Sequence, residues 1–366
     1  MKIQFHKGFR VKKLSAAFVF MAASASGAAL AQTSVSSAVV LYGRLDTSIE
    51  SVRFSDVRSA PDSSAVNLSK ATSYWGLRGQ ESLGGGMRAY FKLESGFFVD
   101  TGASGSSASL FNREAYVGLG SNIGSLQLGS QYAPSLLLTT KVDPFQRIAS
   151  GSIINLMQQS SGNRSRGYLG VQNNAIHYIS PTTQGMTARA FYGLSERSTA
   201  PRDLGSFASL ALDYQNGPFF VGVTAEDQSV AGDLANTSVC MRTYTLGATY
   251  DLKFIKLTGY LLKNDLEAKT DVNAYLVGFV LPLGPGQVRS SYASRETRNV
   301  PGARANVISL GYTYDLSKRT VLYTTYSRLQ NDFESTSGLL PSIRTYSPAL
   351  KGQDIASLEV GLRHNF

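Results

Sequence analysis

The chain has 366 residues, of which 43% are hydrophobic and only 16% charged, whereas soluble proteins carry about 25% charged residues. Its mean hydropathy is −0.08. Beyond the first 31 residues no apolar run reaches the length of about 18 residues that a membrane-spanning helix needs. One cysteine excludes a disulfide framework and a multi-cysteine metal site. With three histidines in all, we expect neither a bound metal nor a cofactor. Glycine and tyrosine are frequent, so large β architectures are favoured.

Residues 1–31 have the pattern of a secretory signal peptide. Five basic residues precede an apolar stretch that runs to about Ala25, and an A-x-A cleavage site ends at Ala31. Removing this segment lowers the net charge from +10 to +5, because it takes away five basic and no acidic residues. The mature chain, residues 32–366, has no clustered positive charge, so we expect no nucleic-acid partner.

The mature chain alternates apolar and polar residues with a period of two, which indicates strands with two different faces. In the first strand, Leu41, Leu45 and Ile49 share one face, while Arg44 and Asp46 lie on the other. The pattern predicts sixteen strands, at 39–50, 74–80, 87–94, 112–120, 125–132, 173–180, 186–192, 208–215, 218–226, 242–250, 253–262, 272–281, 286–294, 306–315, 320–328 and 354–366.

The connections between these strands alternate between short turns and long polar segments. Seven short and eight long connections predict antiparallel strands with one short-turned rim and one long-looped rim. This is the plan of an outer-membrane β-barrel, with an even strand number, short periplasmic turns and long external loops. The sequence therefore predicts an all-β protein, a sixteen-stranded antiparallel transmembrane barrel.

The charged row of each strand is expected to face the barrel interior. A lipid-facing Arg or Lys near the membrane centre would cost about 2–4 kcal/mol, so the apolar row must face lipid. A soluble sandwich would instead bury that row. Aromatic residues at strand ends, such as Trp75, Tyr178 and Tyr250, favour the membrane, and a barrel of this size encloses an aqueous channel.

Several segments carry a resemblance to one family. They are Val39–Asp46, Tyr74–Gly79, Gly84–Gly86, Phe91–Phe97, Arg113–Leu119, Gly129–Tyr132, Val142–Phe145 and Val360–Phe366. The chain resembles the general porins of Gram-negative bacteria, of the β-proteobacterial type. The resemblance implies an outer-membrane homotrimer that passes small hydrophilic solutes passively and meets membrane lipid and lipopolysaccharide. It also implies that the assembly machinery recognises the terminal Phe366 and that the third long loop folds into the channel.

That third loop is long in this sequence, at about 41 residues between 132 and 172. Structureless loops above about 12–15 residues are uncommon and are often functional. Asp143 matches the loop acid of the family, which implies a place at the constriction. Arg44 and Arg78 match family positions that line the narrow part of the pore.

Alternation places further residues in the lumen: Asp46, Tyr74, Arg88, Lys92, Glu94 and His177. Arg88 and Lys92 could instead lie near a rim. His177 is expected to face pore water with an ordinary pKa of about 6.5. The family's arginines are replaced at Tyr74, Ser130 and His177, so we expect only weak anion selectivity.

Other functions remain open on the sequence. An outer-membrane enzyme would need a Ser/His or Asp/His site, and the mature chain offers only His177 and His364. We therefore expect no enzyme. A blocked structural or adhesin barrel would need residues 132–172 to fill the bore. A solute-specific channel would use inward-facing tyrosines. Cys240, in a predicted external loop at 227–241, is a free thiol, a candidate for a mixed disulfide, or an incidental buried thiol.

Overall fold

The computed structural model describes residues 39–55, 57, 63–68, 73–147, 150–157, 170–232, 237–266, 270–339 and 350–366. They belong to one compact unit, Ser36–Phe366. The predicted signal peptide, residues 1–31, lies outside the described residues.

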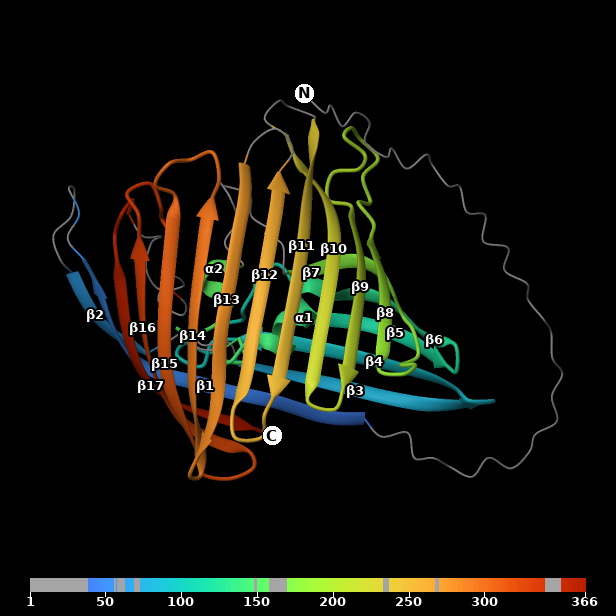
Figure 1. Ribbon diagram of the computed structural model, residues 1–366. Helices are drawn as coiled ribbons and strands as arrows, with labels where there is room; N and C mark the ends of the chain where they lie inside the picture. The colour runs from blue at the N-terminus through green and yellow to red at the C-terminus, as the bar shows by residue number, and fades with distance from the viewer. Residues whose placement is uncertain are drawn as a thin grey trace. The chain divides into compact units, whose positions relative to one another are not determined.

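Strands dominate this part of the chain (Figure 1). They are β1 (Val39–Phe54), β2 (Ser63–Leu68), β3 (Ser73–Gly84), β4 (Met87–Phe97), β5 (Glu114–Ser121), β6 (Gly124–Tyr132), β7 (Val171–Ile179), β8 (Met186–Gly193), β9 (Phe207–Asn216), β10 (Phe219–Ala231), β11 (Ser238–Asp251), β12 (Lys256–Leu266), β13 (Thr270–Leu283), β14 (Gly286–Thr297), β15 (Arg304–Asp315), β16 (Thr320–Asn331) and β17 (Ile355–Asn365). Two helices, α1 (Pro134–Val142) and α2 (Ile154–Met157), lie between β6 and β7. Neither is long and apolar enough to cross a membrane.

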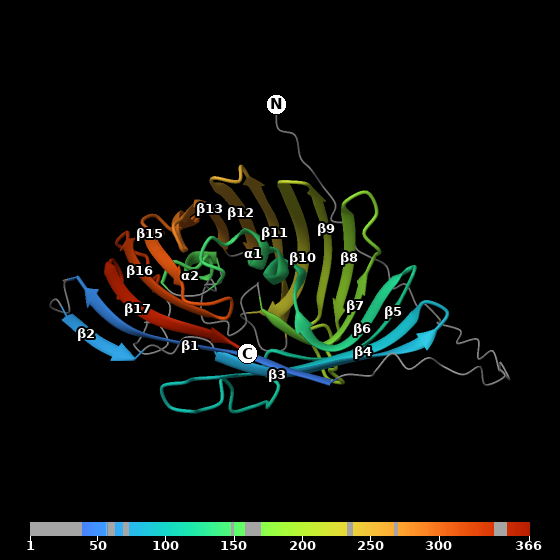
Figure 2. The same cartoon turned by 90° about the horizontal axis from the view of Figure 1, so that it is seen from below.

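The strands close into a barrel. Each strand from β3 to β16 pairs antiparallel with the next, and β1 pairs with β17. On its other edge β1 has two partners: β3 pairs with Val39–Arg44 and the short β2 pairs with Ile49–Phe54. Together β2 and β3 therefore occupy the place of one strand in the barrel. The described strands thus confirm the predicted sixteen-stranded antiparallel barrel. Figure 2 shows α1 and α2 inside the curve of the strands.

The strands extend beyond several predicted ends on the long-looped side. β10 continues to Ala231 and β11 begins at Ser238, so the bounds predicted for the loop 227–241 are wrong, and Cys240 lies in a strand, opposite Ser229. The alternation of apolar residues marks the part of a strand that meets lipid. Above that level the backbone ladder continues, but the outward row carries polar side chains such as Asp227 and Arg242, and the sequence signal ends before the strand does.

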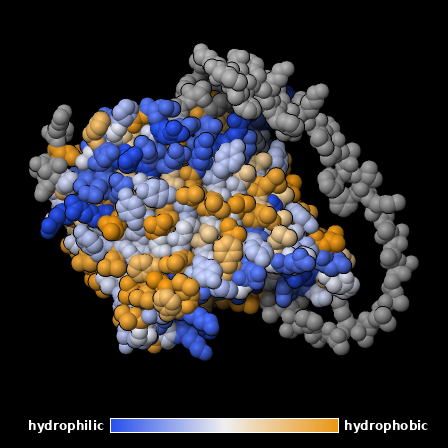
Figure 3. Space-filling model, in the orientation of Figure 1, coloured by the Kyte–Doolittle hydropathy of each residue, from blue (hydrophilic) through white to orange (hydrophobic). Residues whose placement is uncertain are grey.

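The two faces of the wall differ as predicted. On β1 and β17 the outward row, including Leu45, Ile49, Leu358 and Val360, is exposed, while the inward Glu50 is buried. On the face drawn in Figure 3, hydrophobic side chains gather in the middle and lower parts and hydrophilic ones at the upper rim. An apolar belt beneath a polar rim is the surface that an outer-membrane barrel presents to lipid.

The seam between β1 and the chain terminus depends on a glycine. The backbones of Gly43 and Phe366 exchange two hydrogen bonds of 3.1 Å. A Cβ on Gly43 would lie 2.4 Å from Cζ of Phe366 and 2.6 Å from the carbonyl oxygen of Tyr74. The aromatic ring therefore covers the space that a side chain would occupy, and the seam closes only because residue 43 has none.

We expect Gly43→Val to hinder closure of the barrel, at a cost of about 1–3 kcal/mol for overpacking. The measurement is the fraction of protein with heat-modifiable mobility in gel electrophoresis after refolding. Gly259→Val is the matched control, because a Cβ on Gly259 of β12 would meet no atom within 4 Å. Equal folded fractions for the two variants would contradict this account of the seam.

Candidate functional site

The segment after β6 lies against the inner wall of the barrel. Its helix α1 packs Leu138 and Val142 over Gly222 of β10 and Gly247 of β11, which face each other across the two strands. A Cβ on Gly222 would lie 2.6 Å from Cδ1 of Leu138, and a Cβ on Gly247 would lie 3.0 Å from Cγ1 of Val142. Glycine within a strand often marks the close approach of another segment, and both glycines have that role here.

The same packing continues past the helix. Cγ of Pro144 would lie 2.7 Å from a Cβ on Gly278 of β13, and Cε1 of Phe145 would lie 3.0 Å from a Cβ on Gly311 of β15. Inward-facing glycines on four strands therefore form the surface beneath residues 138–145. We call this surface the glycine track; it consists of Gly222, Gly247, Gly278 and Gly311.

Charged side chains of the wall hold the backbone of this segment. Glu226 of β10 accepts hydrogen bonds from the backbone N–H (3.0 Å) and hydroxyl (2.8 Å) of Ser135. Glu359 of β17 accepts one from the N–H of Ser150 (2.6 Å). From β14, Arg289 donates to the carbonyl of Pro144 and Arg295 to that of Leu156, both at 3.0 Å. Polar backbone groups placed inside a barrel need such partners.

Asp143 stabilises the loop from within and does not face the open lumen. Its side chain is 6% exposed. It accepts hydrogen bonds from the N–H groups of Phe145 (2.9 Å), Arg147 (2.7 Å) and Ile153 (3.0 Å), and from the hydroxyl of Ser152 (3.2 Å). Burial raises the pKa of the Asp143 carboxyl, and the three N–H groups oppose that rise by stabilising the carboxylate. Its carboxylate therefore fixes the turn after α1, while its predicted place at the constriction stays a prediction.

Three arginines without a described carboxylate partner lie on the opposite inner wall, formed by β1, β3 and β4; Arg78 and Arg88 are exposed, while Arg44 is half-buried and its Nε donates to Oδ1 of Asn365 at 3.0 Å. The guanidinium of Arg44 lies 5.7 Å from the ring centre of Tyr74, that of Arg78 lies 5.0 Å from Tyr42, and that of Arg88 lies 5.7 Å from Tyr90. No described carboxylate lies within ion-pair distance of these three arginines. Arg88 is the second residue of β4, beside the short turn, so it lies near that rim, whereas Arg44 lies further into the barrel.

Lys92 and Glu94 belong to a cluster whose charges balance. Lys92 bonds Glu114 and lies 3.3 Å from Glu94, and Nε of Arg113 lies 2.5 Å from Glu94. Two cations thus meet two carboxylates. The sequence analysis missed Arg113 and Glu114 as site residues, although both stand in the segment Arg113–Leu119 that carries the resemblance.

Asp46 is likewise neutralised and buried, with 1% exposure. Nε of Arg363 lies 2.8 Å from its Oδ2, and the hydroxyl of Tyr323 donates to its Oδ1 at 2.7 Å. On β8, Arg189 pairs with Asp213. Alternation gave the inward direction of these side chains correctly, but their charges are offset by neighbours on adjacent strands.

His177 is on the inward face, as alternation predicts, but it does not meet pore water. It is 2% exposed, and its ring centre lies 5.1 Å from that of Phe191. Phe191, Phe207, Ala175 and Ala133 form a buried apolar cluster beside it. The predicted water-facing histidine is therefore wrong, because the start of the inward loop covers this part of the wall.

A cavity of about 650 Å³ lies along the arginine wall. Its lining includes Tyr42, Arg78, Arg88, Tyr90, Lys92 and Tyr116. This surface offers positive charge and aromatic hydroxyls to a solute. Within the described ranges, no group of three or more His, Cys, Asp or Glu residues is placed to hold a metal ion.

The comparisons with known proteins agree with this geometry. The Gram-negative porin family matches residues 16–334. Outer membrane porin protein 32 of Delftia acidovorans is 32% identical over 94% of this chain and 97% of its own length. An outer membrane porin protein of Bordetella pertussis is 31% identical over 84% of this chain and 91% of its own. Among solved structures, an anion-selective porin from Comamonas acidovorans has a TM-score of 0.79 at 29% identity, covering 90% of this chain and all of that one. The chain belongs to the Gram-negative porin family and is an integral β-barrel of the outer membrane.

Proposed function

We propose that this porin is a general diffusion channel for ions and small hydrophilic solutes with a weak preference for anions, and that Arg44, Arg78 and Arg88 carry this preference. The observation behind the proposal is that these three guanidinium groups face the lumen without a described carboxylate partner. On the same wall, Lys92 and Glu94 belong to a balanced cluster and Asp46 pairs with Arg363.

The three arginines form a path from the short-turned rim toward the middle of the barrel. A ring of basic side chains in a pore lowers the barrier for anions. At about 0.1 M salt the Debye length is about 10 Å, so charges in a narrow section act on every passing ion, whereas rim charges are screened. Arg44 and Arg78 should therefore matter more than Arg88.

We further propose that residues 133–157 form the constriction. Their contacts with the glycine track and their bonds to Glu226, Glu359 and Arg289 support this role. The loop covers one wall, while the cavity along the arginine wall remains open, which favours a channel over a blocked barrel. The ring faces of Tyr42, Tyr74 and Tyr90 are stacked with arginines, so a solute-specific aromatic path has less support than general diffusion.

Its relatives are porins, which are channels rather than enzymes. Three further proposals rest on the family resemblance: a homotrimer, contact with outer-membrane lipid and lipopolysaccharide, and recognition of Phe366 by the assembly machinery. The exposed outward row of β17, with Leu358, Val360 and Leu362, supports the lipid contact. Cleavage after Ala31 also remains a proposal.

Neutralising the lumen arginines should shift ion selectivity toward cations. We expect Arg44→Gln and Arg78→Gln each to lower the chloride-to-potassium permeability ratio, Arg88→Gln to lower it less, and the triple variant to bring it close to one. Zero-current potentials in a KCl gradient near 0.1 M measure this, and the wild-type preference should fade at about 1 M, where the Debye length is about 3 Å. Arg328→Gln is the control, since Arg328 is exposed on the outward face of β16. Cation preference in the wild type would refute the assignment.

His177 should not contribute to any pH dependence of the pore. Because its ring is buried against Phe191, we expect His177→Phe to leave the permeability ratio unchanged between pH 8 and pH 5. The same zero-current potentials provide the readout. A pH response that is present in the wild type and lost in His177→Phe would show that the ring reaches pore water.

Adding side-chain volume to the glycine track should displace α1. We expect Gly247→Val to push Leu138 and Val142 off the wall, to destabilise their packing by about 1–3 kcal/mol, and to lower single-channel conductance as the helix moves into the lumen. Leu138→Ala in the same chain should restore much of the conductance by making room. If Gly247→Val conducts like the wild type, the loop does not limit the current.

A further inference from the structure

The cavity along the arginine wall has a regular floor, built by inward side chains of β3, β4 and β5. Strand register arranges them in three rows. The row beside the short turn has Arg88 and Gly120, the middle row has Gln80, Tyr90 and Gly118, and the row deeper in the barrel has Arg78, Lys92 and Tyr116. Because inward rows follow each other at about 7 Å along a strand, the two arginine rows are about 13 Å apart.

Glycines of β5 let the side chains of β4 lie flat on this floor. A Cβ on Gly118 would lie 2.5 Å from Cζ of Tyr90, and a Cβ on Gly120 would lie 3.1 Å from Nε of Arg88. The ring of Tyr90 and the guanidinium of Arg88 therefore extend over β5 and do not project across the pore. The space above the middle row stays open as a result.

The two arginines lean to opposite sides of that space. Arg78 of β3 lies over the ring of Tyr42 on the neighbouring β1, 5.0 Å from its centre, whereas Arg88 leans from β4 toward β5. Both side chains are exposed, and so is Gln80 between them. A solute that contacts both guanidinium groups must therefore pass over the middle row.

The groups between the arginines are free to form hydrogen bonds. The side chains of Gln80 and Tyr116 have no hydrogen-bond partner among the described residues. The hydroxyl of Tyr90 accepts a hydrogen bond from Nε2 of Gln127 (3.1 Å), which leaves its own O–H as a donor. The cavity therefore offers positive charge at its two ends and amide and hydroxyl groups between them.

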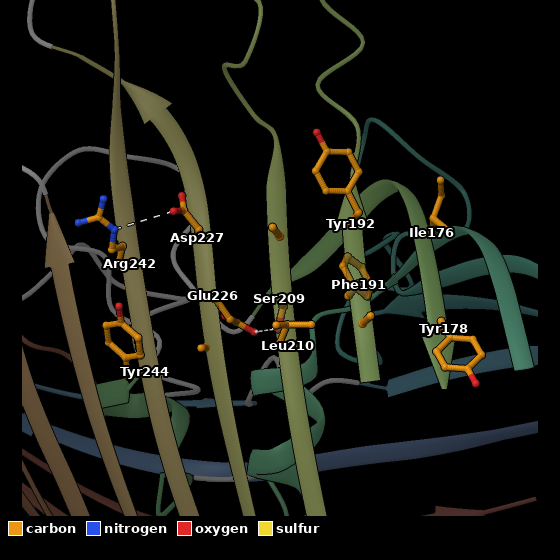
Figure 4. A pocket seen from close by; sticks show the side chains of 13 residues that line it. Ile176, Tyr178, Phe191, Tyr192, Ser209, Leu210, Glu226, Asp227, Arg242 and Tyr244 are labelled. Carbon is orange, nitrogen blue, oxygen red and sulfur yellow. Dashed lines mark hydrogen bonds and ion pairs between the residues drawn. The ribbon is translucent and has the colours of Figure 1, made fainter. Parts of the chain in front are cut away.

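The size and position of the cavity suit a small hydrophilic molecule. Its volume of about 650 Å³ lies in the range of pockets that hold small ligands. Another cavity, of about 490 Å³, lies on the outward face of β7–β11, where Tyr192, Leu210 and Tyr244 are exposed toward lipid (Figure 4). A dissolved solute does not meet that groove, so selection among solutes falls to the cavity in the lumen.

We propose that the cavity along the arginine wall binds phosphorylated sugars, and most strongly a hexose with a phosphate at each end. One phosphate meets Arg88 and the other Arg78, while the sugar hydroxyls bond Gln80, Tyr90 and Tyr116. Guanidinium groups bind phosphate through charge-assisted, often bidentate hydrogen bonds. The inference rests on the proposed anion path, since it uses two of the three arginines of that path.

Block of the chloride current by added solutes tests the proposal. The purified porin in planar bilayers, in about 0.1 M KCl, is titrated with glucose, inorganic phosphate, glucose 6-phosphate and fructose 1,6-bisphosphate at constant ionic strength. We expect no block by glucose, and half-blocking concentrations that fall about two- to tenfold at each step from inorganic phosphate to the bisphosphate, the range for added hydrogen bonds. Pyrophosphate, with two phosphates in a compact molecule, controls for charge and should block less than the bisphosphate.

Variants separate the ends of the cavity from its middle. Arg78→Gln and Arg88→Gln should each remove the advantage of the bisphosphate over the monophosphate. Gln80→Ala and Tyr116→Phe should each reduce the advantage of the monophosphate over inorganic phosphate. Gln330→Ala and Tyr326→Phe are the matched controls, on the outward face of β16. Heat-modifiable mobility confirms that each variant is folded.

Three results would overturn the proposal. They are equal block by pyrophosphate and the bisphosphate, an unchanged order of half-blocking concentrations in both folded middle-row variants, and block by a short dicarboxylate as strong as block by the bisphosphate. If the wild type prefers chloride over potassium but does not distinguish the phosphates, the anion path stands and the sugar-phosphate site is refuted. Cation preference in the wild type would instead refute the anion path itself.

Discussion

The pairing of β1 with β17 is the constraint on which the rest of the structure depends. In hydrocarbon every backbone N–H and C=O must find its partner within the protein, and a sheet meets that demand by closing on itself. Closure gives each strand a lipid face and an interior face. The apolar row around Leu45 and Ile49 and the polar row around Arg44 and Asp46 are both consequences of this one requirement.

The polar interior of the closed barrel is occupied by the loop after β6 on one side only. The loop after β6 rests on glycines of one wall and is held by buried carboxylates and arginines of that wall. On the opposite wall the guanidinium groups of Arg44, Arg78 and Arg88 lie over tyrosine rings, without a described carboxylate partner. Other inward charges have partners of two kinds. Lys92 and Arg113 lie against Glu94 and Glu114, whereas Glu226, Glu359, Arg289 and Arg295 bond groups of the loop.

The sequence was sufficient for sixteen strands and their faces, because alternation with period two is local and the lipid belt enforces it, but the short β2 between the first two predicted strands was missed. It was insufficient for the environment of each inward residue. His177 points inward as predicted, but Phe191 and the loop cover it, and those neighbours are distant in the chain. Asp143 matches a loop acid only by resemblance, and its hydrogen bonds to Phe145 and Ile153 depend on a fold of the loop that alternation does not describe. Cys240 was placed in a loop because the apolar pattern ends at the membrane boundary, whereas backbone pairing does not.

The seam at Gly43 and Phe366 has a consequence for how the barrel is made. At this seam Arg44 bonds Asn365, which lies 321 positions later in the chain. Contacts between such distant segments form slowly, because a long loop must be closed before they contribute any stabilisation. The edge of β1 that pairs with β17 therefore stays unpaired until the end of the chain has reached the membrane. During that interval the two unpaired strand edges can pair with other chains. Because β1 is synthesised first, its edge must be protected until β17 is in place.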